Sequence, residues 1–231
     1  MPVIIIPARL DSLRLPNKPL ACREGRPLIW WTWRQAIRVQ NADVAIATCD
    51  NEIEQAVVEL GMRCIRTSET CQSGTHRAAE AAAWMGLNSK EVVVDWQVDE
   101  PGIQPEWVEQ MLALLEQQPA ADMTTLVAPL PHKIANDCHT TKAVVSNLGR
   151  CHWFSRAPMT GARAHLGIYA CSMLTLQAMG RIGRSSLSIA EGLEQLTWLE
   201  HGWTIYAHTV TEPLPVAINT EEDLSRWQEN A

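Results

Sequence analysis

The chain has 231 residues, of which 46% are apolar and 19% are charged, a composition typical of a single globular domain that can bury a substantial core. The 19 basic and 26 acidic residues give a net charge of −7, which argues against a general nucleic-acid binder and against a protein that binds acidic membranes. Any anionic ligand must therefore be held by local positive charge.

The N-terminal segment and the cysteines favour a cytoplasmic protein. The apolar run at residues 3–6 has no basic leader and is closed by Pro7, which predicts a first strand and not a signal peptide. No apolar window approaches the roughly 18 residues of a membrane span, so no membrane partner is expected. The seven cysteines include no C-x-x-C pair and are odd in number, as is common in a reducing compartment.

The N-terminal half alternates between strand and helix patterns. Strands are predicted at residues 3–6, 43–48 and 62–66, and helices at residues 27–40 and 50–60. This order predicts a parallel sheet with right-handed crossovers.

The loop after the first strand is rich in cations, namely Arg9, Arg14, Lys18, Arg23 and Arg26. A charged loop is usually just solvated. This one follows a buried strand, where the phosphates of a nucleotide would sit, and the protein around it is acidic. Since cations in such a place can neutralise a triphosphate, we favour a functional interpretation.

A polar block precedes an alanine-rich helix predicted at residues 75–85. Ser73 or Thr75 could be only the helix N-cap. That reading leaves unexplained a Gln, a Gly and an Arg at the same helix start. Together these could read the edge of a base, while Gly74 lets the backbone come close.

The central stretch of the chain is EVVVDWQVDEP, residues 91–101. Its three valines predict a strand that is covered on both faces. The residues that follow include Asp95, Gln97, Asp99 and Glu100. Carboxylates at the carboxyl end of a buried strand can hold a hard cation against phosphate oxygens. The alternative is an acidic strand-to-loop transition without a ligand, and this stretch alone does not separate the two.

The C-terminal half predicts a second kind of sheet. A helix at residues 105–118 and a strand at 122–128 are followed by strands at 141–146, 150–155 and 166–170. The short turn at residues 147–149 makes the strands at 141–146 and 150–155 antiparallel. We therefore expect one α/β domain over residues 1–231, with a mostly parallel sheet flanked by helices and a smaller antiparallel lobe at about residues 130–170.

The remaining elements complete the prediction. Helices are expected at residues 174–179 and 189–201, with a strand at 204–208 between them and the last helix at 221–229. Thr220 is the predicted N-cap of that last helix, with Asp223 in position for a capping-box-like contact.

A series of ordered blocks resembles the 3-deoxy-manno-octulosonate cytidylyltransferases, or CMP-Kdo synthetases. They are IPARLDSLRLPNKPLA at residues 6–21, QSGTHRAAE at 72–80, WQVDEP at 96–101, WFSRAP at 153–158, HLGIYA at 165–170, LEQLTWLEHG at 193–202 and NTEEDL at 219–224. The resemblance covers nearly the whole chain. It implies a nucleotidyltransferase-type, Rossmann-like fold, usually a homodimer, that uses CTP and Mg²⁺ to make CMP-Kdo and pyrophosphate for lipopolysaccharide biosynthesis.

The resemblance also implies roles for individual residues. The triphosphate would be held by Arg14 and Lys18. The rest of the nucleotide would meet Ala8, Arg9, Gln72, Ser73, Gly74 and Arg77. Asp99 would be a magnesium ligand, with Asn219 at the position where the family has a second Asp. The sugar acid would meet Gln97, Glu100, His165, Glu194 and Gln195, with Arg156 as the candidate partner of its carboxylate.

The chain departs from the family pattern at a few positions. Val98 replaces the Gly of Q-G-D-E-P and would fill space near the sugar, and Asn17 replaces the Gly of L-P-G-K, which is mild because Asn tolerates a left-handed conformation. Asn219 can ligate Mg²⁺ but lacks the charge of Asp, so affinity should fall. The segment at residues 157–164 is shorter than is usual in the family.

These departures keep two alternatives open. One is a cytidylyltransferase-fold protein that binds a nucleotide or a partner with weak or no turnover. The other is an enzyme that acts on a different acidic sugar, such as an amino-substituted or shorter ulosonate.

Overall fold

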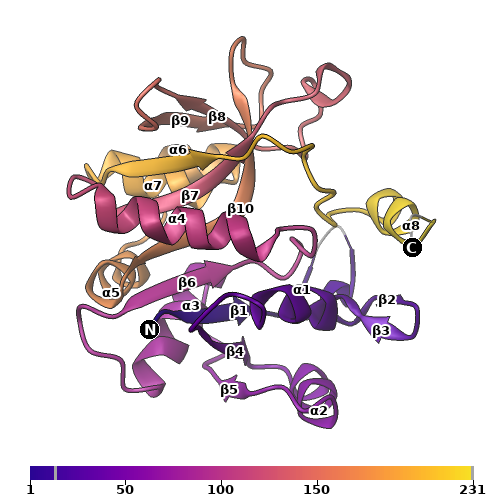
Figure 1. Cartoon of the computed structure of the whole chain (residues 1–231). Coiled ribbons are helices and arrows are strands. Elements are labelled where there is room, and N and C mark those ends of the chain that lie inside the picture. Colours follow the sequence, from indigo (N-terminus) through magenta and orange to yellow (C-terminus); the bar gives the residue numbers. More distant parts are fainter. Residues whose placement is uncertain (13–14, 230–231) are drawn as a thin grey trace.

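The apolar runs of the sequence become the central strands of one mixed sheet in the computed structural model, which describes residues 1–12 and 15–229 (Figure 1). The main path of the sheet has the order β11 (Ile205–Thr209), β7 (Met123–Ala128), β10 (Arg163–Ser172), β6 (Val92–Trp96), β1 (Val3–Pro7), β4 (Asp43–Thr48) and β5 (Cys64–Arg66). All neighbours on this path are parallel except those that β10 makes. The predicted α/β class with a mostly parallel sheet is confirmed.

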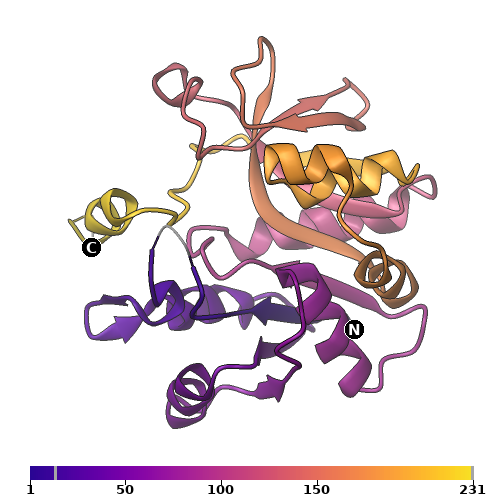
Figure 2. The same ribbon diagram turned by 180° about the vertical axis from the view of Figure 1, so that it is seen from behind.

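Helices cover both faces of the sheet. One face carries α1 (Leu28–Ala36), α2 (Asn51–Glu59) and α4 (Pro105–Gln117). The other face, seen in Figure 2, carries α3 (Gly74–Trp84), α5 (Met173–Arg181), α6 (Ser186–Glu191) and α7 (Glu194–Glu200). The sheet is therefore the middle layer of three.

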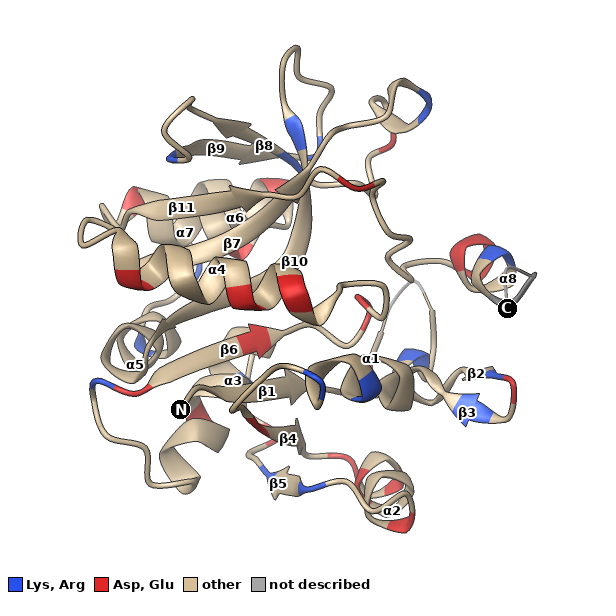
Figure 3. Cartoon of the chain, in the orientation of Figure 1, with Lys and Arg blue, Asp and Glu red and all other residues tan. Residues whose placement is uncertain are grey.

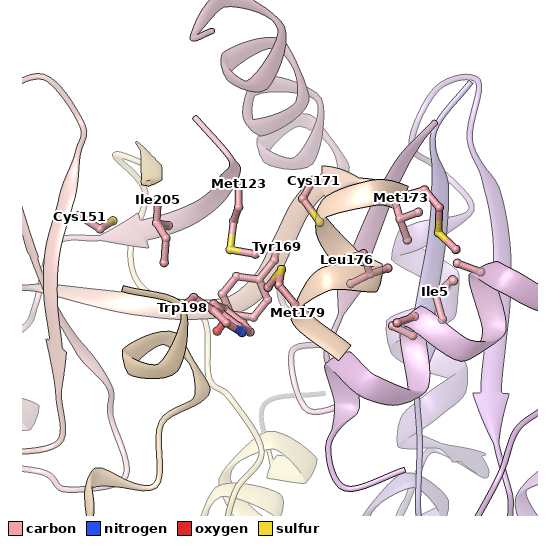
Figure 4. Packing of buried hydrophobic residues seen from close by; sticks show 14 of the residues in the cluster. Ile5, Met123, Cys151, Tyr169, Cys171, Met173, Leu176, Met179, Trp198 and Ile205 are labelled. Atoms are coloured by element: carbon pink, nitrogen blue, oxygen red, sulfur yellow. The ribbon is translucent and has the colours of Figure 1, made fainter. Parts of the chain in front are cut away.

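Alternation along the buried strands distributes side chains between the two layers. On β1, Val3 and Ile5 join the apolar cluster under α3 and α5, part of which is shown in Figure 4, while Ile4 and Ile6 join the cluster under α1 and α4. On β6, Val93 belongs to the first cluster and Val94 to the second. The same alternation turns Asp95 and Gln97 towards the α3 layer. A carboxylate thus enters an otherwise apolar face.

The antiparallel part of the fold differs from its prediction. The hairpin of β8 (Lys142–Val145) and β9 (Cys151–Ser155) is antiparallel as expected. The strand predicted at 166–170 is instead β10, ten residues long, which lies between β6 and β7 inside the main sheet. It pairs with β8 only at its first residues. The lobe is therefore a hairpin that extends the main sheet, because β10 serves both.

The helix predicted at residues 189–201 is two helices, α6 and α7. Gly192 lies between them with φ of 69°, in the left-handed region, where an α-helix cannot continue. The bend places the start of α7 at the sheet face that bears Asp95, because Asp95 and Glu194 both form a hydrogen bond with Thr75.

Two cations of the N-terminal loop lie against aromatic rings. After η1 (Lys18–Leu20), the loop forms a small hairpin of β2 (Cys22–Arg23) and β3 (Arg26–Pro27). The guanidinium of Arg23 lies over the rings of Trp31 and Trp227, at 5.2 and 4.9 Å from their centroids, and that of Arg26 lies over Trp30. These cations stabilise the packing of aromatic rings, and they are not among the residues that line the cavities described below.

An edge-on contact between the rings of Trp31 and Trp227 fixes α8 (Glu221–Glu229) beside α1 (Figure 1). Thr220 Oγ1 accepts from the Asp223 main-chain N–H at 3.2 Å, and Asp223 Oδ2 accepts from the Thr220 N–H at 3.0 Å. The predicted capping box is confirmed. Its position, together with the Trp227 contact, holds the segment that carries Asn219 against the body of the protein.

No helix among the residues that the structure describes is both long and apolar enough to cross a membrane. All seven cysteines fall within the described ranges, and none forms a disulfide there.

Replacing Gly192 with Ala tests why the predicted helix is broken. No atom lies closer than 3.8 Å to the position of an added Cβ, so the cost is backbone strain alone. We expect Gly192→Ala to lower the free energy of unfolding by about 1 kcal/mol, measured by urea denaturation. Gly183→Ala, at a position with open space and no left-handed φ, is the matched control and should cost nothing. Equal stability of the two variants would contradict this explanation.

Candidate active site

A cleft runs along the carboxyl ends of β1 and β6. It contains two adjoining cavities of about 630 and 510 Å³, both within the range of roughly 300–1,000 Å³ that is usual for small-molecule sites. We call the first the Lys18 cavity, which is lined by Ala8, Arg9, Lys18, Arg77, Gln97 and Asp99 among others. The second is the Glu194 cavity, lined among others by Gln72, Glu100, His165, Glu194, Gln195 and Asn219. Ser73, Gly74, Gln97, Asp99 and Arg156 line both, so the two form one site.

Acidic side chains elsewhere gather on the outer helices. Figure 3 shows acidic segments on α2, α4 and α8, which account for much of the negative charge of the chain. The Lys18 cavity, by contrast, has four cations in its wall, Arg9, Lys18, Arg77 and Arg156, against the carboxylates of Asp11 and Asp99. An anion that avoids the general surface can therefore bind here.

The ion pair of Lys18 and Asp99 joins the two halves of the cleft. Lys18 Nζ lies 2.8 Å from Asp99 Oδ2, although the residues are 81 positions apart. Lys18 is carried by η1, whose N-cap Asn17 has φ of 55°. The expectation that Asn17 tolerates a left-handed backbone is confirmed. A cationic turn and an acidic strand tip thus meet in one cavity, as the sequence predicts.

The block before α3 combines capping with a lining role. Ser73 Oγ accepts from the His76 N–H at 3.1 Å, so Ser73 is the N-cap and Thr75 is not. A Cβ on Gly74 would lie 2.8 Å from Gln97 Oε1, so glycine is needed here for the approach of a protein side chain. Arg77 is 3% exposed and donates to Thr67 Oγ1 at 2.5 Å. Arg77 is therefore a buried residue that lines the Lys18 cavity.

A buried group of acids lies beneath the Glu194 cavity. Thr75 Oγ1 is 3.0 Å from Asp95 Oδ2 and 2.8 Å from Glu194 Oε2. Gln97 Nε2 donates to Asp95 Oδ1 at 2.7 Å. Burial, and secondly the charge of Glu194, raises the pKa of Asp95 to about 7. Thr75 thus links Asp95 of β6 to α3, and through Glu194 to α7.

Glu100 is a second buried acid. Burial and the neighbouring Asp99 raise its pKa to about 8, and its Oε1 accepts from the Gly167 N–H at 2.8 Å. Lys18 opposes this shift but does not cancel it. Glu100 therefore ties the tip of β6 to β10 while adding little charge near neutral pH.

His165 and Tyr169 bring β10 into the cleft. Burial lowers the pKa of His165 to about 3, and its Nε2 lies 2.9 Å from Thr125 Oγ1. The imidazole is therefore neutral at pH 7. Tyr169 packs edge-on against Trp198 of α7, as Figure 4 shows, and its hydroxyl accepts a hydrogen bond from Gln195 Nε2. These contacts fix the floor of the Glu194 cavity.

Arg156 stands in the wall common to both cavities. Its guanidinium donates to the main-chain oxygens of Glu191 at 3.2 Å and Cys138 at 3.0 Å. These contacts set the orientation of the guanidinium. A positive charge is thus held where the two cavities join.

Asn219 lies close to Asp99 because the chain before it bonds to the tip of β6. The Ile218 N–H donates to the Asp99 carbonyl oxygen at 2.9 Å, and the Asn219 N–H donates to Asp223 Oδ2 at 3.1 Å. A carboxylate and an amide oxygen are hard donors of the kind that Mg²⁺ prefers. The residues present therefore fit a magnesium ion.

Every predicted site residue that the structure describes lines one or both cavities. Arg14 lies outside the described residues. The individual roles of these residues stay predictions. Sequence reasoning did not assign Thr75 or Tyr169 to the site. It placed Asp95 among the carboxylates after the strand, whereas Asp95 lies within β6 and is buried. Tyr169 had a detectable signal, since it follows His165 and Gly167 at alternate positions of one strand.

Comparison with known proteins agrees with this geometry. The family model described as cytidylyltransferase matches residues 3–202. The chain belongs to the cytidylyltransferase family. A 3-deoxy-manno-octulosonate cytidylyltransferase of Chlorobium phaeobacteroides is 39% identical over 96% of this chain and 94% of that protein. Another, of Chlamydia trachomatis serovar L2, is 36% identical over 97% of this chain and 92% of that protein.

Solved structures extend the similarity to three dimensions. A structure of CMP:2-keto-3-deoxy-manno-octonic acid synthetase complexed with CTP has a TM-score of 0.89 and 32% identity, covering 99% of this chain and 97% of that one. A cytidylyltransferase of Leptospira borgpetersenii, at 18% identity and a TM-score of 0.63, shares the fold alone.

Val98 of this cytidylyltransferase is largely withdrawn from the cleft. It is 9% exposed, belongs to the cluster under α1 and α4, and lines the Lys18 cavity but not the Glu194 cavity. Its carbonyl oxygen accepts from Thr32 Oγ1 at 2.7 Å. The β-branched side chain thus contributes mainly to packing.

The raised pKa of Asp95 predicts a pH-dependent cost to stability. Between its ordinary value of 3.8 and about 7, the folded protein keeps a proton that the unfolded chain has lost, so stability falls as the pH rises through this window. Asp95→Asn keeps an acceptor for Gln97 and supplies a donor to Thr75 without this titration. We expect the free energy of unfolding of the variant, relative to the parent, to rise from about pH 4 to about pH 8 by more than roughly 1 kcal/mol.

Urea unfolding at a series of pH values measures this difference. Glu116→Gln, which removes an exposed carboxylate of α4, is the control and should leave the pH profile unchanged. Parallel profiles for the parent and Asp95→Asn would show that Asp95 ionises at its ordinary pKa.

Proposed function

We propose that this cytidylyltransferase transfers CMP from CTP to a 3-deoxy-ulosonic acid, Kdo or a close relative, and releases pyrophosphate. The observation that carries the proposal is the Lys18–Asp99 pair, which faces the same cavity as Ser73, Gly74 and Arg77. The curated relatives named for this reaction and the CTP-bound structural neighbour support it. Kdo is the acceptor that these relatives' names support best.

In this reaction the anomeric hydroxyl of the sugar acid attacks the α-phosphorus of CTP in line. The protein mainly has to position two anions and to neutralise charge that grows on phosphate oxygens. The ammonium of Lys18 and the guanidinium of Arg9 supply local positive charge for the triphosphate. No covalent nucleophile is needed for this displacement.

The sugar acid would occupy the Glu194 cavity. Arg156, held by main-chain carbonyl oxygens at the junction of the two cavities, is placed to meet its carboxylate. Neutral His165 and the Gln97 amide offer hydrogen bonds to hydroxyl groups without adding charge. The two substrates then meet where the cavities join.

Magnesium is part of the proposal. Asp99 and Asn219 would hold the ion beside the phosphate oxygens, where it would neutralise negative charge when bound. In the structure Asp99 pairs with Lys18, and a bound ion and triphosphate would give each of them a new partner.

We also propose that the protein is a homodimer in the cytoplasm. The family resemblance supports the dimer, and the lack of a disulfide among the described cysteines is compatible with a reducing compartment.

A binding protein without turnover is the second candidate. Asn219 in place of a charged ligand and the short segment at 157–164 favour it. Pyrophosphate release from CTP, Mg²⁺ and a panel of ulosonic acids separates the two candidates. Release with any of these acids supports the enzyme. A CTP-induced rise in melting temperature without pyrophosphate release supports binding alone. If CTP causes neither pyrophosphate release nor a rise in melting temperature, both candidates are removed.

Asp99→Ala should abolish turnover with little loss of fold. The variant removes a carboxylate that is 24% exposed in its side chain, so packing changes little, but it removes the proposed ion ligand. We expect kcat/KM to fall by at least roughly a thousandfold, read by pyrophosphate release, with the melting temperature nearly unchanged. Glu106→Ala on the outer face of α4 is the control. A near-normal rate in Asp99→Ala would refute the metal role.

Asn219→Asp should tighten magnesium binding, because it restores a charged oxygen donor next to Asp99. The measurement is the concentration of Mg²⁺ that gives half-maximal activity, which should fall several-fold. An unchanged or higher value would mean that residue 219 does not contact the ion.

A further inference from the structure

The C-terminal helix α8 joins the protein through an apolar cluster of its own. Leu15, Leu28, Ile218, Leu224 and Trp227 are all buried and form a third cluster, separate from the two that cover the faces of the sheet. Figures 1 and 2 both show α8 to one side of the three layers. Because the sheet has two clusters of its own, it should stay folded when α8 is not docked.

Two members of this third cluster are hydrogen-bonded to the Lys18–Asp99 pair. The Leu15 carbonyl oxygen accepts from the Lys18 main-chain N–H at 3.2 Å, at the start of the turn that carries the ammonium. The Ile218 N–H donates to the Asp99 carbonyl oxygen at 2.9 Å. Leu15 is 2% exposed and Ile218 is fully buried. The main chain of each member of the ion pair is thus tied to a residue that packs in the cluster with α8.

Trp227 is the residue that joins α8 most closely to the rest of the protein. It is 8% exposed, and its ring lies edge-on to that of Trp31 on α1, with 5.9 Å between the centroids. The guanidinium of Arg23 lies over the Trp227 ring, 4.9 Å from its centroid. A ring pair and a cation–π contact therefore add to apolar burial at one side chain.

The first turn of α8 holds the main chain of Asn219. Asp223 Oδ2 accepts from the Asn219 N–H at 3.1 Å and from the Thr220 N–H at 3.0 Å. The preceding residue, Ile218, belongs to the cluster, so Asn219 is held on both sides by contacts that depend on α8. An amide ligand brings no charge to a metal ion, and its contribution therefore depends on its placement.

We propose that Trp227 is a positioning residue for the triphosphate and metal site. By docking α8, it holds Asn219 near Asp99, and through Leu15 it holds the turn that carries Lys18. The inference rests on the proposed function and adds to it a residue that is not among those lining the two cavities. By linkage, a nucleotide and a metal ion bound at the site should in turn stabilise the docking of α8.

The test compares three affinities in the full-length parent and in Trp227→Ala. The Kd of Mn²⁺ in the presence of CTP is read from the electron paramagnetic resonance signal of free Mn²⁺, and the Kd of CTP without metal from calorimetry. The KM of Kdo comes from pyrophosphate release at saturating CTP and Mn²⁺. We expect the Kd of Mn²⁺ to rise about 10–100-fold, as on loss of residues that orient metal ligands, and the Kd of CTP to rise as well.

The KM of Kdo should not change, because Arg156 and His165, the proposed contacts of the sugar acid, lie outside the cluster. A loss of the two nucleotide-site affinities without a loss of the third distinguishes positioning from a general loosening of the fold. Amide hydrogen exchange at residues 221–227 of the parent gives the reciprocal measurement. It should slow when CTP and Mn²⁺ bind, and unchanged exchange would contradict the coupling.

Two further variants serve as controls. Trp227→Phe keeps an aromatic ring on α8 and should recover most of the affinity for Mn²⁺. Trp84→Ala removes a tryptophan that is 72% exposed at the end of α3 and should change none of the three affinities. The melting temperature of Trp227→Ala should fall by only a few degrees. Unfolding of this variant would show that the sheet does depend on α8 and would overturn the inference.

The outcomes separate this inference from the proposed function. If Trp227→Ala binds Mn²⁺ and CTP as tightly as the parent does, the inference is overturned and the proposed function stands. Equal losses in all three affinities would also overturn it. If the parent itself binds neither CTP nor Mn²⁺, the proposed function fails and the inference fails with it.

Discussion

The contact between Lys18 and Asp99 is the constraint on which the site depends. A 2.8 Å ion pair across 81 residues requires that β1 and β6 be neighbours, that both end at the same edge of the sheet, and that the turn after β1 fold back over the tip of β6. Pairing in parallel register meets the first two conditions. Asn17, in a left-handed conformation before η1, meets the third.

The sheet that supplies this edge also buries carboxyl groups beside it. Both faces of β6 are covered, so the alternation that buries Val93 buries Asp95 as well. The carboxyl group is kept by hydrogen bonds to Thr75 and Gln97, which come from α3 and from the strand tip. Glu100 is held in the same way by β10. Stability is thus given up at the positions where the cleft needs polar groups.

Local signals in the sequence predicted much of this site. The valine run, the cationic turn after Pro7 and the capping box at Thr220 each depend on neighbouring residues alone, and each lies where it was expected. The position of β10 inside the main sheet was not predicted, because the pairing of a strand depends on partners that are distant in the chain. The stacking of Arg23 on Trp227 was missed for the same reason. Gly192 carried a local signal that was outweighed by the apolar pattern around it.

The proposed reaction requires the Lys18 and Asp99 side chains to act on one triphosphate. A crystal structure with CTP and Mn²⁺, in which anomalous scattering locates the metal, tests it most directly. We expect the anomalous peak between Asp99 and the phosphate oxygens, with Lys18 Nζ turned from Asp99 to the triphosphate. A nucleotide and metal bound away from this cleft, with the Lys18–Asp99 pair intact, would contradict it.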